Sequence, residues 1–255
     1  MRAVLALAAL TLAALPAAAL AAPSPGACAA EIKRQSEQGE SSVETGCWRL
    51  GPVTLGMTTA EVAALIGPPD HETAGPTVNL PAKVDRTGYR NAFYVFPRDL
   101  AKQLERKPPK ELRTRILKVA YFQDRAVQIA SAPPTETSSN RCGRMRGLAV
   151  TDGDAKGFGP FRSFAGVREG DSVVALEARL GKNDTHNRSG DVFDYWPVPL
   201  TLGVDVEHST VSSFAIGADE DALHLGGWAE VSLTRDPKTC RITGFSFVEK
   251  EPGRR

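Results

Sequence analysis

Hydrophobic and polar residues follow one another in the same order in two separate stretches of the chain. Residues 56–70 and residues 170–184 each begin with Gly and place Thr or Ser two positions later. Apolar residues then recur at helical spacing, a second Gly follows, and an Asp closes the stretch. Self-similarity of this kind predicts two copies of one small α+β module.

Each copy carries signals for the start and the end of a helix. In the first copy Thr58 and Glu61 form a Thr-x-x-Glu capping box, and Gly67 ends the helix ahead of two prolines. In the second copy Ser172 is the predicted N-cap of a helix that runs to Leu180. The helices are therefore expected at equivalent places in the two copies.

Strand patterns follow each helix. Runs of β-branched and aromatic residues predict strands at 91–96, 116–122 and 126–130 in the first copy, and at 191–196, 200–206 and 211–216 in the second. Residues 228–234 and 242–248 alternate around a turn and predict a long terminal hairpin. A short polar helix is expected at 29–38, ahead of the first copy. The chain is thus predicted to be an α+β protein.

The first residues have the composition of a secretory leader. Arg2 precedes an apolar run from Ala3 to Leu15, and small residues end this segment at Ala21. A basic, an apolar and a small-residue region in this order are typical of a signal peptide, and the apolar run is shorter than a membrane span. We expect cleavage after Ala21 and a mature protein that is periplasmic or secreted, with no membrane span.

The four cysteines predict disulfides. They are Cys28, Cys47, Cys142 and Cys240, an even number behind a leader, and their spacing does not match a zinc site. Three pairings are possible. We favour Cys28–Cys47, which closes a short loop, and Cys142–Cys240, which ties the segment between the copies to the terminal hairpin.

The overall charge gives no attraction to nucleic acid, because 31 basic residues face 30 acidic ones. A local exception is the segment 98–115, which has only a two-residue counterpart in the second copy and has an excess of basic residues. It is interpreted either as a solubilising surface element or as a docking element for an anionic surface, with Arg106 and Lys107 as candidate contacts. We expect this insertion to be exposed and dispensable for folding.

Known catalytic templates are missing from the sequence. It contains no nucleophile elbow, no zinc-protease helix motif and no phosphate-binding loop, and the four histidines are scattered. We therefore predict no catalytic residue, no cofactor and no metal site.

Aromatic residues mark one strand in each copy. Tyr94 and Phe96 lie in the first copy, and Tyr195 and Trp196 in the second. Neighbouring residues of a strand face opposite sides, so at least one aromatic side chain in each copy is expected to point away from the helix-covered core. Coverage by loops or by the other copy, and exposure to a protein partner, are both open at this point.

Several of these motifs together carry a resemblance. Gly-Met-Thr at 56–58, Gly-Pro-Pro-Asp at 67–70, the aromatic strand around Tyr94 and Phe-Gln-Asp-Arg-Ala-Val at 122–127 resemble the SmpA/OmlA (BamE-like) module. The tandem copy resembles the two-repeat arrangement of the beta-lactamase inhibitory proteins. The resemblance implies two repeats, each a small antiparallel sheet with helices packed on one face, and a non-catalytic binding role.

These observations predict the following organisation. Residues 1–21 are a signal peptide, 22–47 an N-terminal helix and linker, 48–150 the first repeat with the basic insertion 98–115, and 151–255 the second repeat with the C-terminal hairpin. The expected function is an exported, non-catalytic protein-interaction module, envelope-associated or inhibitor-like, whose partner is another envelope or secreted protein. The alternative is a periplasmic enzyme or small-ligand-binding domain whose site carries no known motif.

Overall fold

The computed structural model describes residues 23–40, 42, 46–74, 88–100, 102, 112–132, 150–151, 155–182, 185–186, 192–195, 198–205, 208–218, 222, 228–235 and 242–250. The predicted signal peptide, the Cys142–Cys240 pairing, Trp196, Arg106 and Lys107 lie outside these residues.

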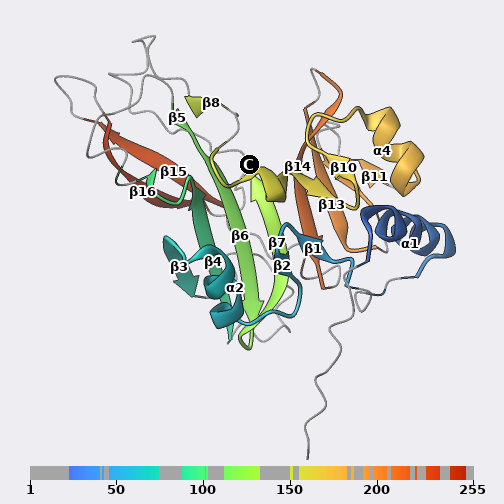
Figure 1. The fold of residues 1–255 in the computed structure, drawn as a ribbon, viewed down its shortest axis with the longest axis horizontal. Helices are drawn as coiled ribbons and strands as arrows, with labels where there is room; N and C mark the ends of the chain where they lie inside the picture. The colour runs from blue at the N-terminus through green and yellow to red at the C-terminus, as the bar shows by residue number, and fades with distance from the viewer. Residues whose placement is uncertain are drawn as a thin grey trace, which may run out of the picture.

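An antiparallel sheet of eight strands forms the centre of the molecule (Figure 1). Its strands are β3 (His71–Ala74), β4 (Tyr89–Phe96), β6 (Arg115–Phe122), β7 (Arg125–Ala132), β11 (Thr185–His186), β12 (Val192–Asp194), β13 (Leu200–Asp205) and β14 (Thr210–Gly217). They lie in the order β11-β12-β13-β14-β7-β6-β4-β3. The chain therefore runs from one edge to the middle and then from the opposite edge to the middle.

The two runs meet at strands β7 and β14. Ile129 of β7 lies opposite Ile216 of β14, and Ala130 lies opposite Ala215. This pairing makes the two four-stranded halves into one continuous sheet.

A small hairpin and a helix precede each half of the sheet. The first hairpin pairs β1 (Arg49–Leu50) with β2 (Val53–Thr54) and leads to α2 (Thr59–Ile66). The second pairs β9 (Ser163–Phe164) with β10 (Val167–Arg168), follows the 3-10 helix η1 (Gly159–Arg162), and leads to α4 (Val173–Leu180). Hairpin, helix and four strands thus follow one another in the same order in both halves.

Local chemistry explains where these helices begin and end. The Thr58 hydroxyl accepts a hydrogen bond from the Glu61 N–H within a complete capping box, and the Ser172 hydroxyl accepts one from the Ala175 N–H. Both helices stop at a glycine with a positive φ, 85° at Gly67 and 90° at Gly181. Such a φ strains any residue that carries a Cβ, which accounts for glycine at both positions.

The helices cover one face of the sheet. In Figure 1 α2, α4 and the N-terminal helix α1 (Pro25–Gln38) lie on the viewer's side. Between them and the strands is one apolar core, which includes Ile32 of α1, Val62 of α2 and Leu176 of α4. Helices and antiparallel strands in these layers confirm the α+β class predicted from the sequence.

Two further strand pairs lie outside the central sheet. The terminal hairpin pairs β15 (Trp228–Arg235) with β16 (Ile242–Lys250), close to the predicted segments. The short strands β5 (Leu112–Arg113) and β8 (Val150–Thr151) form a parallel pair.

Both faces of the central strands are buried. Tyr94 and Phe96 belong to the core on the helix side, while Phe93, Asn91 and Lys118 alternate with such residues and are also buried. Phe93 thus points away from the helix-side core, as expected for one aromatic side chain of this strand, and of the two alternatives left open for it, coverage holds and exposure does not. The reason is that the second face of the sheet is covered as well, which a strand pattern does not reveal.

The ends of the basic insertion are buried too. Leu100, Thr114 and Arg115 are each at most 2% exposed. Arg115 is the first residue of β6, and its charge is paired with the equally buried Glu169. The prediction that segment 98–115 is exposed is therefore wrong at these positions, while its middle lies outside the described residues.

Candidate functional site: a basic cleft beside a disulfide

The three described aromatic side chains among those proposed as partner contacts do not form a surface. The Tyr94 hydroxyl lies 3.4 Å from the Tyr121 hydroxyl inside the core, and Phe96 packs on Phe158 with ring centres 5.3 Å apart. Tyr195 is fully buried. Burial raises the pKa of Tyr94 and of Tyr195 above the usual tyrosine range. These three side chains therefore serve the core.

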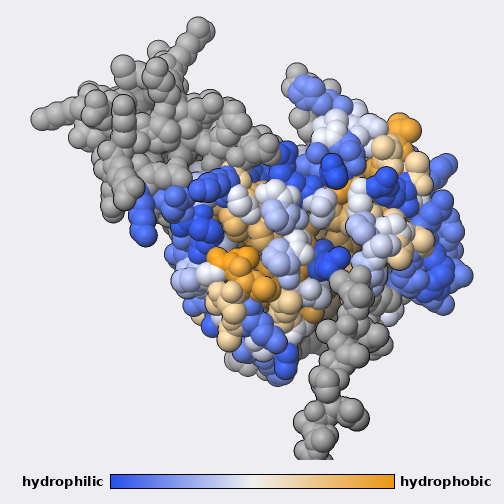
Figure 2. Space-filling view, in the orientation of Figure 1, coloured by the Kyte–Doolittle hydropathy of each residue, from blue (hydrophilic) through white to orange (hydrophobic). Residues whose placement is uncertain are grey.

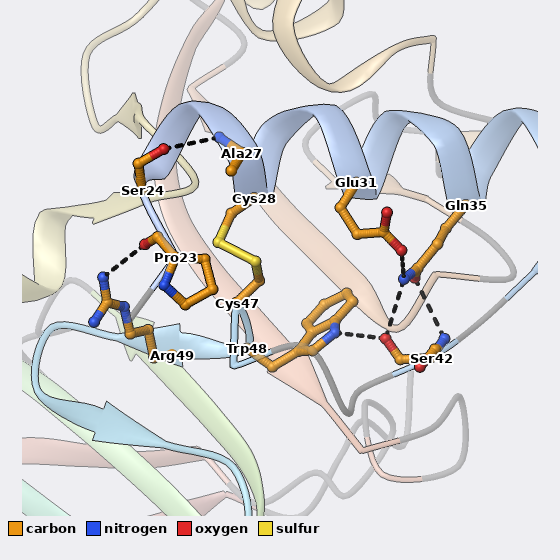
Figure 3. Close-up of a disulfide and its surroundings, with 10 residues drawn as sticks. All are labelled: Pro23, Ser24, Ala27, Cys28, Glu31, Gln35, Ser42, Cys47, Trp48 and Arg49. Atoms are coloured by element: carbon orange, nitrogen blue, oxygen red, sulfur yellow. Dashed lines mark hydrogen bonds between the residues drawn. A yellow bond between two sulfur atoms is a disulfide. The ribbon is translucent and has the colours of Figure 1, made fainter. Parts of the chain in front are cut away.

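The disulfide between Cys28 and Cys47 is present, as predicted. It joins the N-terminal turn of α1 to the residue before Trp48, across 5.2 Å between the two Cα atoms (Figure 3). Disulfides of this kind are typical of proteins that fold in an oxidising compartment.

Polar contacts fasten the other end of α1 (Figure 3). The Gln35 side chain, which is fully buried, donates to the Ser42 carbonyl at 3.2 Å and accepts from the Ser42 N–H at 3.3 Å. The Trp48 indole N–H donates to the same carbonyl at 2.8 Å. Together with the disulfide, these bonds hold α1 and residues 42–49 side by side.

An open cleft of about 510 Å³ lies next to the disulfide. Its walls come from the N-terminal turn of α1, from β1, from η1, from the β9–β10 hairpin and from the last turn of α4. Segments far apart in the sequence therefore build it, and the Cys28–Cys47 bond is part of one wall.

Three arginines give the cleft its charge. Arg49, Arg168 and Arg179 line it, and no acidic residue is among its described lining residues. Arg49 Nη2 donates to the Pro23 carbonyl at 3.4 Å, and Arg179 Nη1 donates to the Gly166 carbonyl. Carbonyl partners are neutral, so these bonds orient the guanidinium groups without cancelling their charge.

The acidic residues of the neighbouring hairpin are engaged elsewhere. Glu169 is buried and pairs with Arg115 and, at 2.9 Å, with Arg162. Asp171 Oδ2 accepts a hydrogen bond from the backbone N–H of Arg168 at 2.8 Å. Neither residue is among the described lining residues of the cleft, whose charged side chains are therefore the three arginines.

Chemically, this arrangement suits an anion. A guanidinium presents a planar set of donors that matches a carboxylate or a phosphate, and it stays protonated at any physiological pH. The first turn of α1 contains no acidic residue, so the positive end of its helix dipole also faces an anion favourably.

A second hollow, of about 690 Å³, lies at the ends of β3, β4 and β6. Its charges are paired internally: Arg90 contacts Asp124 at 3.1 Å and Glu72 at 3.7 Å, and lies over the Tyr121 ring. A hydrogen bond from the Thr59 hydroxyl is the main cause that lowers the pKa of Asp124. This hollow offers no comparable excess of charge.

Within the described ranges, no three His, Cys, Asp or Glu side chains are grouped so that they could hold a metal ion. None of the helices in that part of the chain has the length and apolar composition of a membrane-spanning segment. Comparison of the chain with protein-family models, with curated proteins and with solved structures finds no match.

Sequence reasoning missed the cleft arginines. The signal was a difference between the two copies: Arg168 and Arg179 stand where the first copy has Thr54 and Leu65. Arginines that occur in one copy alone point to a property of that half. A comparison of the copies does not place Arg49 near Arg168 and Arg179, because Arg49 comes close to them only through the packing of the two hairpins.

Proposed function

We propose that this protein is an exported, non-catalytic protein-interaction module that receives its partner on the helix-bearing face. The observation that carries the proposal is the cleft, where three arginines with no carboxylate among the described lining residues are open to solvent. Arginine is enriched where proteins recognise one another, and positive patches select partners of opposite charge.

An apolar surface on the same face supports a protein partner. Only Val62 of α2 is buried, and Leu65 of the same helix is 50% exposed. Figure 2 shows hydrophobic residues gathered in the region of α2, with polar residues around them. An apolar patch next to oriented charges is the composition of many protein interfaces.

The repeated order of elements also supports the proposal. Hairpin, helix and four strands, used twice in one sheet, are compatible with the BamE-like tandem that the sequence resembles. That resemblance implies binding rather than catalysis. The predicted leader and the Cys28–Cys47 bond support export.

The test is capture of a partner followed by binding with purified components. Envelope extract is passed over the immobilised mature protein and over the doubly substituted Leu65→Asp/Arg168→Glu protein. The proposal expects a protein retained by the first alone, which then binds the purified wild type and loses at least tenfold in affinity for the variant. The control Arg125→Gln removes an exposed arginine of the first half, whose Nη1 donates to the Gly56 carbonyl at 3.1 Å.

The cleft also supports a second candidate, a domain that binds a small ligand. Its volume of about 510 Å³ falls in the range of small-molecule sites. A rise in melting temperature with millimolar small anions, combined with no retained protein, would favour this candidate over a protein partner.

A further inference from the structure

We infer that the basic cleft binds an acidic peptide segment, two of whose carboxylates pair with the guanidinium groups of Arg49, Arg168 and Arg179. This inference rests on the proposed function, because it names the part of the partner that the cleft receives. It can fail while the proposed function stands.

The first step concerns charge. Three like charges line one cleft, and the two acids nearest to Arg168 in the sequence, Glu169 and Asp171, are hydrogen-bonded or paired to groups outside the cleft lining or to backbone. Each further positive charge raises the repulsion within the free protein. A ligand with one negative charge leaves two of the three positive charges unbalanced, whereas a ligand with two carboxylates leaves only one.

The second step concerns orientation. The bonds from Arg49 to the Pro23 carbonyl and from Arg179 to the Gly166 carbonyl orient two guanidinium groups, which come from different elements, β1 and α4. Arg168 is exposed, and its side chain makes no hydrogen bond or ion pair with any other described residue. The guanidinium groups of Arg49 and Arg179 are thus oriented before a ligand binds, which lowers the entropy cost of binding. The Arg168 side chain can turn toward the ligand.

The third step concerns shape. The cleft is far larger than a single oxyanion requires, and apart from the arginines and Ser163 its described lining consists of glycine and apolar residues, among them Pro25, Pro160, Ala165 and the disulfide. Such walls accept the aliphatic parts and the main chain of a peptide. A free phosphate would leave this surface uncovered, so the geometry favours a short acidic segment.

The experiment measures fluorescence anisotropy of a labelled peptide that contains two adjacent aspartates, with the disulfide intact. The matched peptide has both aspartates replaced by asparagine, and inorganic phosphate is the competitor. The inference expects binding of the acidic peptide, little binding of the amide peptide, and a severalfold weaker affinity when salt rises from about 50 to about 300 mM.

Two charge reversals locate the site. Arg168→Glu is expected to lower the affinity for the acidic peptide at least tenfold. Arg125→Glu, in the other half, is expected to lower it less than twofold. Circular-dichroism melts establish that both variants fold, which is expected because both side chains are exposed. Equal effects of the two reversals would overturn the assignment to the cleft.

The remaining outcomes separate the ligand classes and the two proposals. Phosphate that binds in an Arg168-dependent way, with no binding of the acidic peptide, overturns the peptide assignment. A captured partner whose affinity is unchanged by Arg168→Glu overturns this inference and leaves the interaction module standing. Acidic-peptide binding with no captured partner supports the cleft and contradicts the proposed function.

Discussion

At the scale of single residues, Lys118 is the most unusual group in the sheet. It lies on β6 between Phe93 of β4 and Ala130 of β7, with 6% of its surface exposed. Burial lowers the pKa of this amine from 10.5 to about 7. An unfolded chain therefore holds a proton on Lys118 at pH values where the folded chain does not.

This difference predicts a pH dependence. Between pH 7 and pH 10.5 the unfolded state binds more protons, so the free energy of unfolding rises with pH through this window and is flat below it. Lys118→Met should remove the slope and stabilise the protein by several kcal/mol near pH 7. Urea unfolding from about pH 6 to about pH 9.5 measures both effects, below the range where the buried tyrosines titrate. The same slope in both proteins would contradict the assignment.

A second residue-scale feature is the buried carboxylate of Glu169. Its side chain is 3% exposed and pairs with Arg115, which is 1% exposed, and with Arg162, which is 31% exposed. Removing the acid leaves the Arg115 charge buried without this partner, and such losses cost about 3–5 kcal/mol.

Glu169→Gln is therefore expected to lower the free energy of unfolding by about 3–5 kcal/mol, whereas Arg162→Gln should cost about 1 kcal/mol or less. Denaturant unfolding of the two variants at neutral pH makes the comparison. Because Glu169→Gln removes both pairs, equal losses would mean that the pair with Arg162 accounts for the whole effect and that the pair with Arg115 adds nothing.

At the scale of elements, the two short helices depend on their caps. The Thr58 and Ser172 hydroxyls accept hydrogen bonds from Glu61 N and Ala175 N, each at 3.2 Å. An N-cap of this type stabilises by about 0.5–2 kcal/mol relative to alanine. Thr58→Ala and Ser172→Ala should therefore destabilise by similar amounts in this range, and Thr58→Ser, which keeps the hydroxyl, by much less. Thermal unfolding of the variants measures these losses of stability. If either alanine substitution left the stability unchanged, the two hydroxyls would not be equivalent N-caps.

These helices also show what can be read from the sequence. Caps and stops at Thr58, Ser172, Gly67 and Gly181 were predictable, because they depend on hydrogen bonds and φ values within one or two turns. Strands β4, β6 and β7 were predictable from their long apolar runs. The edge strand β3, His71–Ala74, was not, since its polar residues become a strand only by pairing with β4.

The candidate site was less predictable than the fold. The burial of Tyr94 depends on coverage of both sheet faces, and the meeting of Arg49 with Arg168 depends on how the two hairpins pack. Both are relations between separate segments, which for Arg49 and Arg168 lie more than a hundred residues apart, and a strand or helix period carries no information about them. The paired Cys28 and Cys47, by contrast, are close in sequence, and their bond was predicted.

At the scale of the whole molecule, the two halves share one core. Strands β7 and β14 join the sheet, and Trp48 of the first half packs on Phe164 of the second, with ring centres 5.8 Å apart. Apolar groups from both halves belong to one cluster. A structure of this kind is expected to unfold in a single cooperative transition.

Ile216→Ala tests this expectation. Ile216 is fully buried on β14, so its truncation should cost about 2–5 kcal/mol. Native-state hydrogen exchange should then show the same loss of protection for amides of β4, in the first half, as for amides of β13, in the second. A loss confined to β13 would mean that the halves open separately.

The disulfide between Cys28 and Cys47 makes the geometry of the cleft depend on the oxidation state of the protein. Pro25 and Cys28 supply one wall of the cleft, and Arg49 follows Cys47 by two residues, so one covalent link fixes both against each other. With reduced thiols, the hydrogen bonds of Gln35 and Trp48 to Ser42 still hold the far end of α1, but no covalent link holds its N-terminal turn against the residues that lead into Arg49. If the cleft binds an acidic segment as inferred, reduction of this one bond is expected to weaken that binding, because two walls of the cleft lose the covalent link between them.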